Sequence, residues 1–181
     1  STGYIRSESE TGNARVKWIF NNTTGTHTFH FGYSSVEYIP LVFTHSSGSS
    51  ATVYAATYHS DPLNLPYPPT VTHVRNNLWL DNSANTVDRF WYLQTLGNIP
   101  SANLTFNCTP SETGIISNLV AQKWVNSAPE GWTNPPPGSQ TSLSNGVQAN
   151  SITQLNNWWT LSGNSVLLPI ELLGFEAQCI D

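Results

Sequence analysis

Residues 86–96, TVDRFWYLQTL, constrain the fold of this chain more than any other stretch. In an extended strand, successive side chains point to opposite faces of the sheet. Trp91 and Leu93 therefore share one face, and Phe90 and Tyr92 share the other. Because both faces carry large apolar side chains, the stretch is predicted to be a central strand that is covered on both sides.

Other short alternating runs, separated by clusters of Gly, Pro, Asn and Ser, recur along the chain. Residues 15–20 and 27–31 are expected to form a hairpin across the turn NNTTG. Pro40 removes a backbone donor from the run 38–44 and is expected to place it at an edge or a bulge. No segment shows a sustained helical period. The other strand candidates are 51–59, 71–74, 78–80, 103–108, 119–125, 148–155, 158–161 and 167–177.

About eleven strand candidates separated by turn signals are typical of an antiparallel β-sandwich, either a jelly roll or an immunoglobulin-like fold. A chain of 181 residues is long enough for one such domain with a full core. We therefore expect residues 1–181 to form a single β-sandwich domain. The proline-rich stretches 63–69 and 129–138 are expected to be surface connections, because neither a helix nor a central strand tolerates them.

The charge content is unusually low. Only 9% of the residues are charged, against about 25% in a typical protein, so the surface is expected to be rich in hydroxyl and amide groups. The net charge is −5 with only six Lys and Arg residues, which leaves no basic stripe for a phosphate backbone and argues against a nucleic-acid partner. No apolar run approaches the ~18 residues of a membrane span, and none is expected.

Cys108 and Cys179 are the only cysteines. Their spacing fits no zinc site, since one zinc ion needs about four ligands and the five histidines are scattered. A disulfide between Cys108 and Cys179 is predicted, which would join the last strand to the middle of the domain. The alternative is two buried thiols.

Little in the sequence favours a metal site. His27 and His30 are three residues apart and fall on opposite faces of a strand, so they are poor joint ligands. Residues 81–88 offer oxygen ligands for calcium, but they lack the ordered acidic spacing and the glycine of an EF-hand loop. An Asx-rich turn is the preferred interpretation, with calcium as the alternative and no other cofactor expected.

Catalysis is not expected either. His45 precedes two serines, but no G-x-S-x-G elbow is present. A glycosidase would need two carboxyl groups roughly 5 to 9 Å apart, and the few acids are more simply interpreted as turn residues or as partners for Arg75 and Arg89. The acids considered are Glu37, Asp61, Asp81 and Asp88. We therefore predict a non-enzymatic protein.

The tryptophans provide the strongest indication of a ligand. Trp132 lies in a proline-rich loop, and Trp124 precedes it. The neighbours Trp158 and Trp159 must face opposite sides of a strand, so one of them is expected to be exposed. Trp124, Trp132 and Trp158 are the candidate platform on which sugar rings would stack. The alternative is that these rings belong to the core of the sandwich.

The end of the chain, residues 168–177 (LPIELLGFEA), resembles the LPVELLSF-type segment that precedes the C-terminal type IX secretion sorting region in many secreted Bacteroidetes proteins. Upstream, residues 29–32 (FHFG) resemble the family's FPFG turn. The other similar stretches are YIPL at 38–41, RFW at 89–91, and KW at 123–124 with Trp132. The resemblance covers nearly the whole chain. It implies an extracellular β-sandwich module that is a fragment or processed part of a longer secreted protein.

The expected function is a non-enzymatic structural or adhesion module of a bacterial surface or secreted protein, with glycan binding as the alternative. The partners would be other domains of the parent protein, identical subunits or glycans. The apolar run 166–175 is expected to pair with its own sheet or with the edge of a neighbouring subunit, which would build a filament. Its apolar positions are Leu168, Ile170, Leu172 and Phe175.

Overall fold

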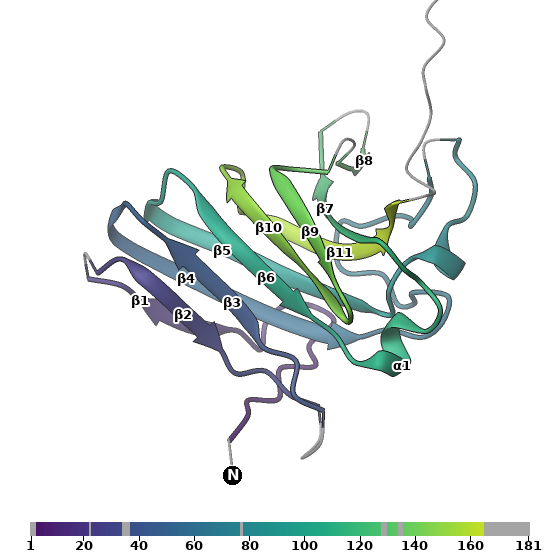
Figure 1. Cartoon of the computed structure of the whole chain (residues 1–181), viewed down its shortest axis with the longest axis horizontal. Coiled ribbons are helices and arrows are strands. Elements are labelled where there is room, and N and C mark those ends of the chain that lie inside the picture. Colours follow the sequence, from purple (N-terminus) through teal and green to yellow (C-terminus); the bar gives the residue numbers. More distant parts are fainter. Residues whose placement is uncertain are drawn as a thin grey trace, which may run out of the picture.

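A computed structural model describes residues 3–21, 23–33, 37–76, 78–127, 130–133 and 136–164. Within these ranges, eleven strands form two antiparallel sheets that lie as two layers (Figure 1). The predicted antiparallel β-sandwich is therefore confirmed. The proposed assembly strand, with Leu168, Ile170, Leu172 and Phe175, lies outside the described residues.

The two sheets draw their strands from the whole described chain. The six-stranded sheet has the order β1 (Val16–Ile19), β4 (Ser49–His59), β5 (Arg89–Asn98), β11 (Asn157–Gly163), β7 (Leu119–Val125) and β8 (Gly131–Trp132). The five-stranded sheet has the order β2 (Gly25–Phe29), β3 (Leu41–His45), β6 (Ala102–Asn107), β10 (Gly146–Ile152) and β9 (Ser139–Leu143). Two short helical turns, η1 (Ser83–Asn85) and α1 (Pro110–Thr113), lie in the connections. No helix in the described ranges is long and apolar enough to span a membrane.

Strand β5 is a central strand, as predicted. It pairs with β4 on one side and β11 on the other. Trp91 and Leu93 point into the core between the two sheets, where both are fully buried. Phe90 and Tyr92 point to the outer face, where they belong to a second apolar cluster. Both faces of β5 are therefore covered, because its alternation supplies large apolar groups in both directions.

The cover of the outer face comes from the long connection between β4 and β5. Val71 and Val74 of this connection are buried against Phe90 and Trp124. The predictions of strands at 71–74 and 78–80 were therefore wrong. The segment packs through its side chains on a sheet face, and its described residues form only an isolated bridge between Arg75 and Asp81.

The predicted hairpin of residues 15–20 and 27–31 is also wrong. Strand β1 pairs with β4 and strand β2 pairs with β3, so the chain crosses from one sheet to the other between them. The crossing lets Phe20 and Phe29 enter the central core from opposite layers. Pro40 lies just before β3, which is an interior strand between β2 and β6, so the missing N–H falls outside the ladder rather than at an edge or a bulge.

The sheets are joined along one side by side chains of β9. The Gln140 carboxamide accepts the N–H of Ala121 on β7 at 2.6 Å and donates to the Ala121 carbonyl at 2.8 Å. The Ser142 hydroxyl accepts the N–H of Leu119 at 2.9 Å. These side chains supply the hydrogen bonds that a neighbouring strand would otherwise give to the first half of β7, which protects an open sheet edge.

Candidate functional site

A buried ionic cluster lies at the beginning of β5. The Arg89 side chain has no exposed surface, and its Nη2 and Nε atoms lie 2.6 and 2.7 Å from Oε1 of Glu112. The Nη1 atom lies 3.1 Å from Oε1 of Glu8. A guanidinium without water requires such partners, because an unpaired buried charge costs several kcal/mol. The cluster joins the N-terminal segment, β5 and α1.

Glu112 is positioned by the first turn of α1. Its backbone N–H donates to the Thr109 hydroxyl at 3.3 Å, and its Oε2 accepts the Thr109 N–H at 2.8 Å, which forms a capping box. Burial opposes ionisation of Glu112, but the Arg89 charge and the hydrogen bonds from Arg89, Thr109 and His59 outweigh it and lower the pKa. Glu112 is therefore an anion at neutral pH.

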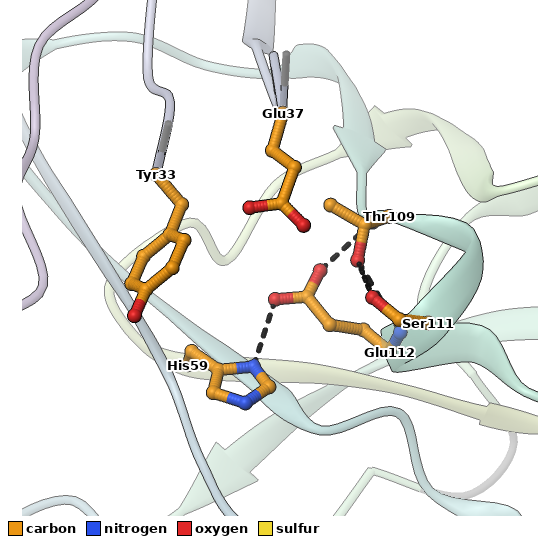
Figure 2. A pocket seen from close by; sticks show the side chains of 6 residues that line it. All are labelled: Tyr33, Glu37, His59, Thr109, Ser111 and Glu112. Carbon is orange, nitrogen blue, oxygen red and sulfur yellow. Dashed lines mark hydrogen bonds and ion pairs between the residues drawn. The ribbon is translucent and has the colours of Figure 1, made fainter. Parts of the chain in front are cut away.

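A pocket of about 130 Å³ opens above Glu112 (Figure 2). His59 donates from Nδ1 to Oε1 of Glu112 at 3.0 Å, and its side chain is 46% exposed. Figure 2 shows the carboxylates of Glu37 and Glu112 pointing into the same space, with the Tyr33 ring to one side. The lining residues are Tyr33, Glu37, His59, Thr109, Ser111 and Glu112.

The charged groups of this pocket bind one another and connect parts of the fold. A general acid needs a carboxyl group with a raised pKa, whereas Glu112 is held ionised by Arg89. Its oxygens already accept from Arg89, His59 and Thr109, so they are poorly placed to attack a substrate. Arg89 does pair with acids, but the expectation that they would come from Glu37, Asp61, Asp81 and Asp88 is wrong. Its ion-pair partners are Glu8 and Glu112.

Asp88 lies beside this cluster in a second depression of about 190 Å³. Burial, aided by the nearby acids Glu112 and Asp61 and opposed by His59, raises the pKa of Asp88 to about 6. The Asn64 amide lies 3.4 Å from Oδ1 of Asp88. The pKa of Asp88 is raised and that of Glu112 is lowered, as in a catalytic acid–base pair. Glu112 is nevertheless bound to Arg89, so it is not free to act as the base of such a pair.

The predicted tryptophan platform is wrong for two of its three residues. Trp124 is completely buried and Trp158 is 2% exposed, since both belong to the cluster on the outer face of the six-stranded sheet. Trp132 is half-buried and donates from Nε1 to the His73 carbonyl at 2.9 Å. Trp159, the neighbour of Trp158, is buried in the central core. Both faces of β11 are covered, so neither ring of the pair is free for a sugar.

The Cys108 thiol is buried beside α1, where Sγ lies 3.2 Å from the Thr113 hydroxyl. Burial raises the pKa of Cys108 to about 11, so the sulfur is a protonated thiol at neutral pH. Cys179, its predicted disulfide partner, lies outside the described residues. The disulfide stays a prediction.

Among the described residues, three consecutive large apolar side chains are exposed in the Trp79 loop, defined here as residues 75–76 and 78–81. Leu78 is 62% exposed, and Trp79 and Leu80 are each 60% exposed. The Asn76 side-chain oxygen accepts the N–H groups of Leu78 and Leu80 at 2.9 and 3.1 Å. Sequence reasoning missed this loop because its apolar residues resemble a strand, although the flanking Asn and Asp residues are a turn signal.

His73 supports Trp79 from within the fold. Its ring lies 5.4 Å from the Trp79 ring and 5.2 Å from the Trp124 ring. Its Nδ1 accepts the N–H of Arg75 at 3.1 Å, which places the proton of the neutral imidazole on Nε2. Burial and the Arg75 charge lower the pKa of His73, with Glu130 opposing them. The ring behind Trp79 is therefore uncharged at neutral pH.

Across the parts of the chain that the structure describes, no group of three or more His, Cys, Asp or Glu side chains is arranged to hold a metal ion. The Asp81 carboxylate accepts from the Ser83 hydroxyl at 2.7 Å and from its N–H at 3.4 Å. These bonds are those of an Asx turn leading into η1. Calcium at this segment stays an untested alternative.

No protein-family model, curated protein or solved structure matches this chain.

Proposed function

We propose that this chain is a non-enzymatic structural and adhesion module of a secreted or cell-surface bacterial protein, and that the Trp79 loop is its contact surface. The observation that carries the proposal is the exposure of Leu78, Trp79 and Leu80, each at about 60%. Single exposed apolar residues are ordinary on protein surfaces. Three consecutive large ones on one loop are typical of an interaction site.

The internal hydrogen bonds of the loop support this role. The Trp79 N–H donates to the Asn76 carbonyl at 2.9 Å, and the Asn76 N–H donates to the Leu80 carbonyl at the same distance. Trp79 has a φ of 62°, a conformation that L-residues other than Asn, Asp and Gly rarely adopt. Strain of this kind costs on the order of 1 kcal/mol and is concentrated at functional sites. A preorganised loop loses little conformational entropy when it binds a ligand.

The ionic cluster supports the non-enzymatic part of the proposal. Its three charged groups satisfy one another inside the fold, and Glu112 also completes the cap of α1. Such a cluster joins distant segments into one rigid end of the sandwich. The low charge content and the resemblance of residues 168–177 support a secreted or surface location.

The adhesion proposal is tested with the purified chain coupled to beads. Retention is measured on immobilised polysaccharides and on immobilised phosphatidylcholine vesicles. Beads that carry the triple variant Leu78→Ala/Trp79→Ala/Leu80→Ala should be retained at least about tenfold less than wild-type beads. The variant removes most of the exposed apolar surface of the loop. The matched control is Leu63→Ala/Leu65→Ala, which alters two leucines exposed at 60% and 41% on another loop. Retention that is equal for the wild type and the triple variant, or absent from every surface, contradicts the proposal.

Assembly through residues 166–175 is a separate part of the proposal. The strands of both described sheets lie between Val16 and Gly163, and the alternating run Leu168, Ile170, Leu172 lies outside the described residues. An added strand with apolar groups can pair with an exposed edge of another subunit. Sedimentation velocity of residues 1–181 and 1–164 tests this. Larger species only for the longer chain are expected, and equal sedimentation of two folded monomers contradicts assembly.

A further inference from the structure

We infer that the Trp79 loop binds a carboxylated pyranose, such as a uronic-acid unit of an acidic polysaccharide. In this arrangement the apolar face of the sugar ring stacks on the Trp79 indole, and the sugar carboxylate pairs with the Arg75 guanidinium. The inference rests on the proposed function, because it assigns a ligand class to the same loop.

The area of the loop fits a small ligand rather than a folded protein. One tryptophan side chain buries at most about 250 Å², and Leu78, Trp79 and Leu80 are already about 40% covered. The loop therefore offers on the order of a few hundred Å², whereas a stable protein–protein interface covers about 800 Å² on each partner. A sugar unit with its neighbours is of the right size.

The orientation of the indole suits stacking. Trp79 is exposed over 60% of its surface, and the neutral His73 ring lies tilted against it at 5.4 Å between ring centres. An aromatic ring held in this way presents a flat, rigid face to the C–H groups of a pyranose at low cost in conformational entropy. Leu78 and Leu80, the sequence neighbours of Trp79, are 62% and 60% exposed and add apolar surface for adjoining sugar units of a chain.

Arg75 supplies the preference for an acid. Five of the six cationic side chains have partners within the described structure. These are Arg6 at 4.9 Å from the Tyr33 ring, Lys17 at 5.8 Å from the Tyr54 ring, Arg15 with Gln94, Lys123 with Gln154, and Arg89 with two glutamates. The exposed Arg75 side chain forms no salt bridge with any described carboxylate. Arg75 belongs to the same loop as Trp79, where its backbone bridges to Asp81. A guanidinium fork matches a planar carboxylate in two parallel hydrogen bonds.

A lipid bilayer fits the loop less well. Insertion of the three apolar side chains would bring the polar groups of Arg75, Asn76 and Asp81 to the membrane surface. The chain also carries a net charge of −5, which an anionic membrane would repel. A single unpaired cation gives a weak attraction to an anionic surface, at about 1 kcal/mol per charge. A saccharide instead uses both the ring face and the guanidinium.

The test is calorimetric titration of residues 1–181 with trigalacturonic acid, with the neutral galactotriose, and with phosphatidylcholine and phosphatidylglycerol vesicles. The acidic sugar should bind more tightly than the neutral one, and raising the salt from 50 to 500 mM should weaken only the acidic sugar. Trp79→Ala should weaken binding of both sugars at least about tenfold. Arg75→Gln should abolish the difference between the two sugars, and the controls Arg15→Gln and Leu63→Ala should bind as the wild type does.

Two results would overturn the inference. One is equal affinity for the two sugars in the wild type, and the other is binding to vesicles but to neither sugar. If either result still depends on Trp79, the adhesive role of the loop stands and only the ligand class is wrong. If the bead retention described above does not depend on the loop, the proposed function itself fails. Circular dichroism of each variant establishes that a loss of binding is not a loss of fold.

Discussion

The Arg89 guanidinium and the Glu112 carboxylate form an enclosed ion pair, with Nη2 2.6 Å from Oε1 and side-chain exposures of 0% and 3%. The pair connects the first residue of β5 to α1 across 23 positions of sequence. Glu8 extends the connection to the N-terminal segment. A buried pair of this kind contributes to stability chiefly through the penalty that follows when one partner is lost.

Glu112→Gln should therefore lower the free energy of unfolding by about 3 to 5 kcal/mol, because Arg89 stays buried without its main counter-charge. The double variant Arg89→Met/Glu112→Leu should lose clearly less, since the fully buried charges are both removed and the remaining Glu8 carboxylate is partly exposed and keeps its bond from the His59 N–H. Urea unfolding measures both, with the exposed Glu10→Gln as the control. A double variant at least as unstable as Glu112→Gln would contradict this account.

Asp88 should make the protein less stable as the pH rises. Burial raises its pKa from 3.8 to about 6 in the folded state, so the folded state holds the proton more tightly than the unfolded state does. Stability contributed by this proton is present below pH 4 and is lost between about pH 4 and 6. Asp88→Asn should raise the free energy of unfolding at pH 7.5 by about 1 kcal/mol, after allowance for screening by solvent.

The pH dependence of Asp88→Asn provides the control for that prediction. Near pH 4 the wild-type carboxyl group is protonated in the folded state and resembles the amide, so the two proteins should unfold at similar urea concentrations. A constant difference from pH 4 to 7.5 would mean that the effect of the variant is not electrostatic.

His27 should contribute to acid sensitivity. Its ring lies 4.2 Å from the Phe20 ring and 5.6 Å from the His45 ring, and burial followed by the proximity of His45 lowers its pKa. The unfolded chain then binds a proton near pH 6.5 before the folded chain does, so stability falls as the pH drops below 6.5. His27→Phe should show a smaller loss of unfolding free energy between pH 7.5 and 5. Parallel curves for the two proteins would exclude this role.

Gln140→Ala should open the side of the sandwich between β7 and β9. The substitution leaves the N–H and C=O of Ala121, a completely buried residue, without their side-chain partners. Each buried polar group left unpaired costs about 1 to 3 kcal/mol. Amide hydrogen exchange should become faster at Ala121, while the neighbouring Thr141→Ala, at an exposed position, should leave it unchanged. Unaltered protection at Ala121 in Gln140→Ala would show that another group satisfies it.

The backbone at Trp79 should be strained independently of any ligand. At a φ of 62° a side chain other than that of Asn or Asp is unfavourable by about 1 kcal/mol relative to glycine. Trp79→Gly should therefore be more stable than Trp79→Ala by about that amount in thermal unfolding, although both lose the indole. Equal stability would show that the loop relaxes its backbone when the ring is removed.

Several elements were predictable from sequence because they depend on local geometry. The alternation of Phe90, Trp91, Tyr92 and Leu93 determined which side chain lies on which face of β5, since strand geometry allows no other assignment. Residues 119–125 match β7 in full for the same reason. The capping box of Thr109 and Glu112 was also readable in the sequence, and its pattern would have drawn attention to Glu112.

What covers each face was decided only in the tertiary structure. Trp124 and Trp158 are buried because the connection between β4 and β5 folds over the outer face of the sheet, a contact between segments distant in sequence. The apolar residues at 78–80 were predicted to form a strand, but they are exposed. The Asn76 side chain accepts the N–H groups of Leu78 and Leu80 and so holds these residues in a loop. Sequence by itself therefore determined strands such as β5 and β7 and the two-sided character of β5. The burial of the tryptophans, the pairing of Arg89 with Glu8 and Glu112, and the exposure of Trp79 depend on long-range packing, which no local pattern encodes.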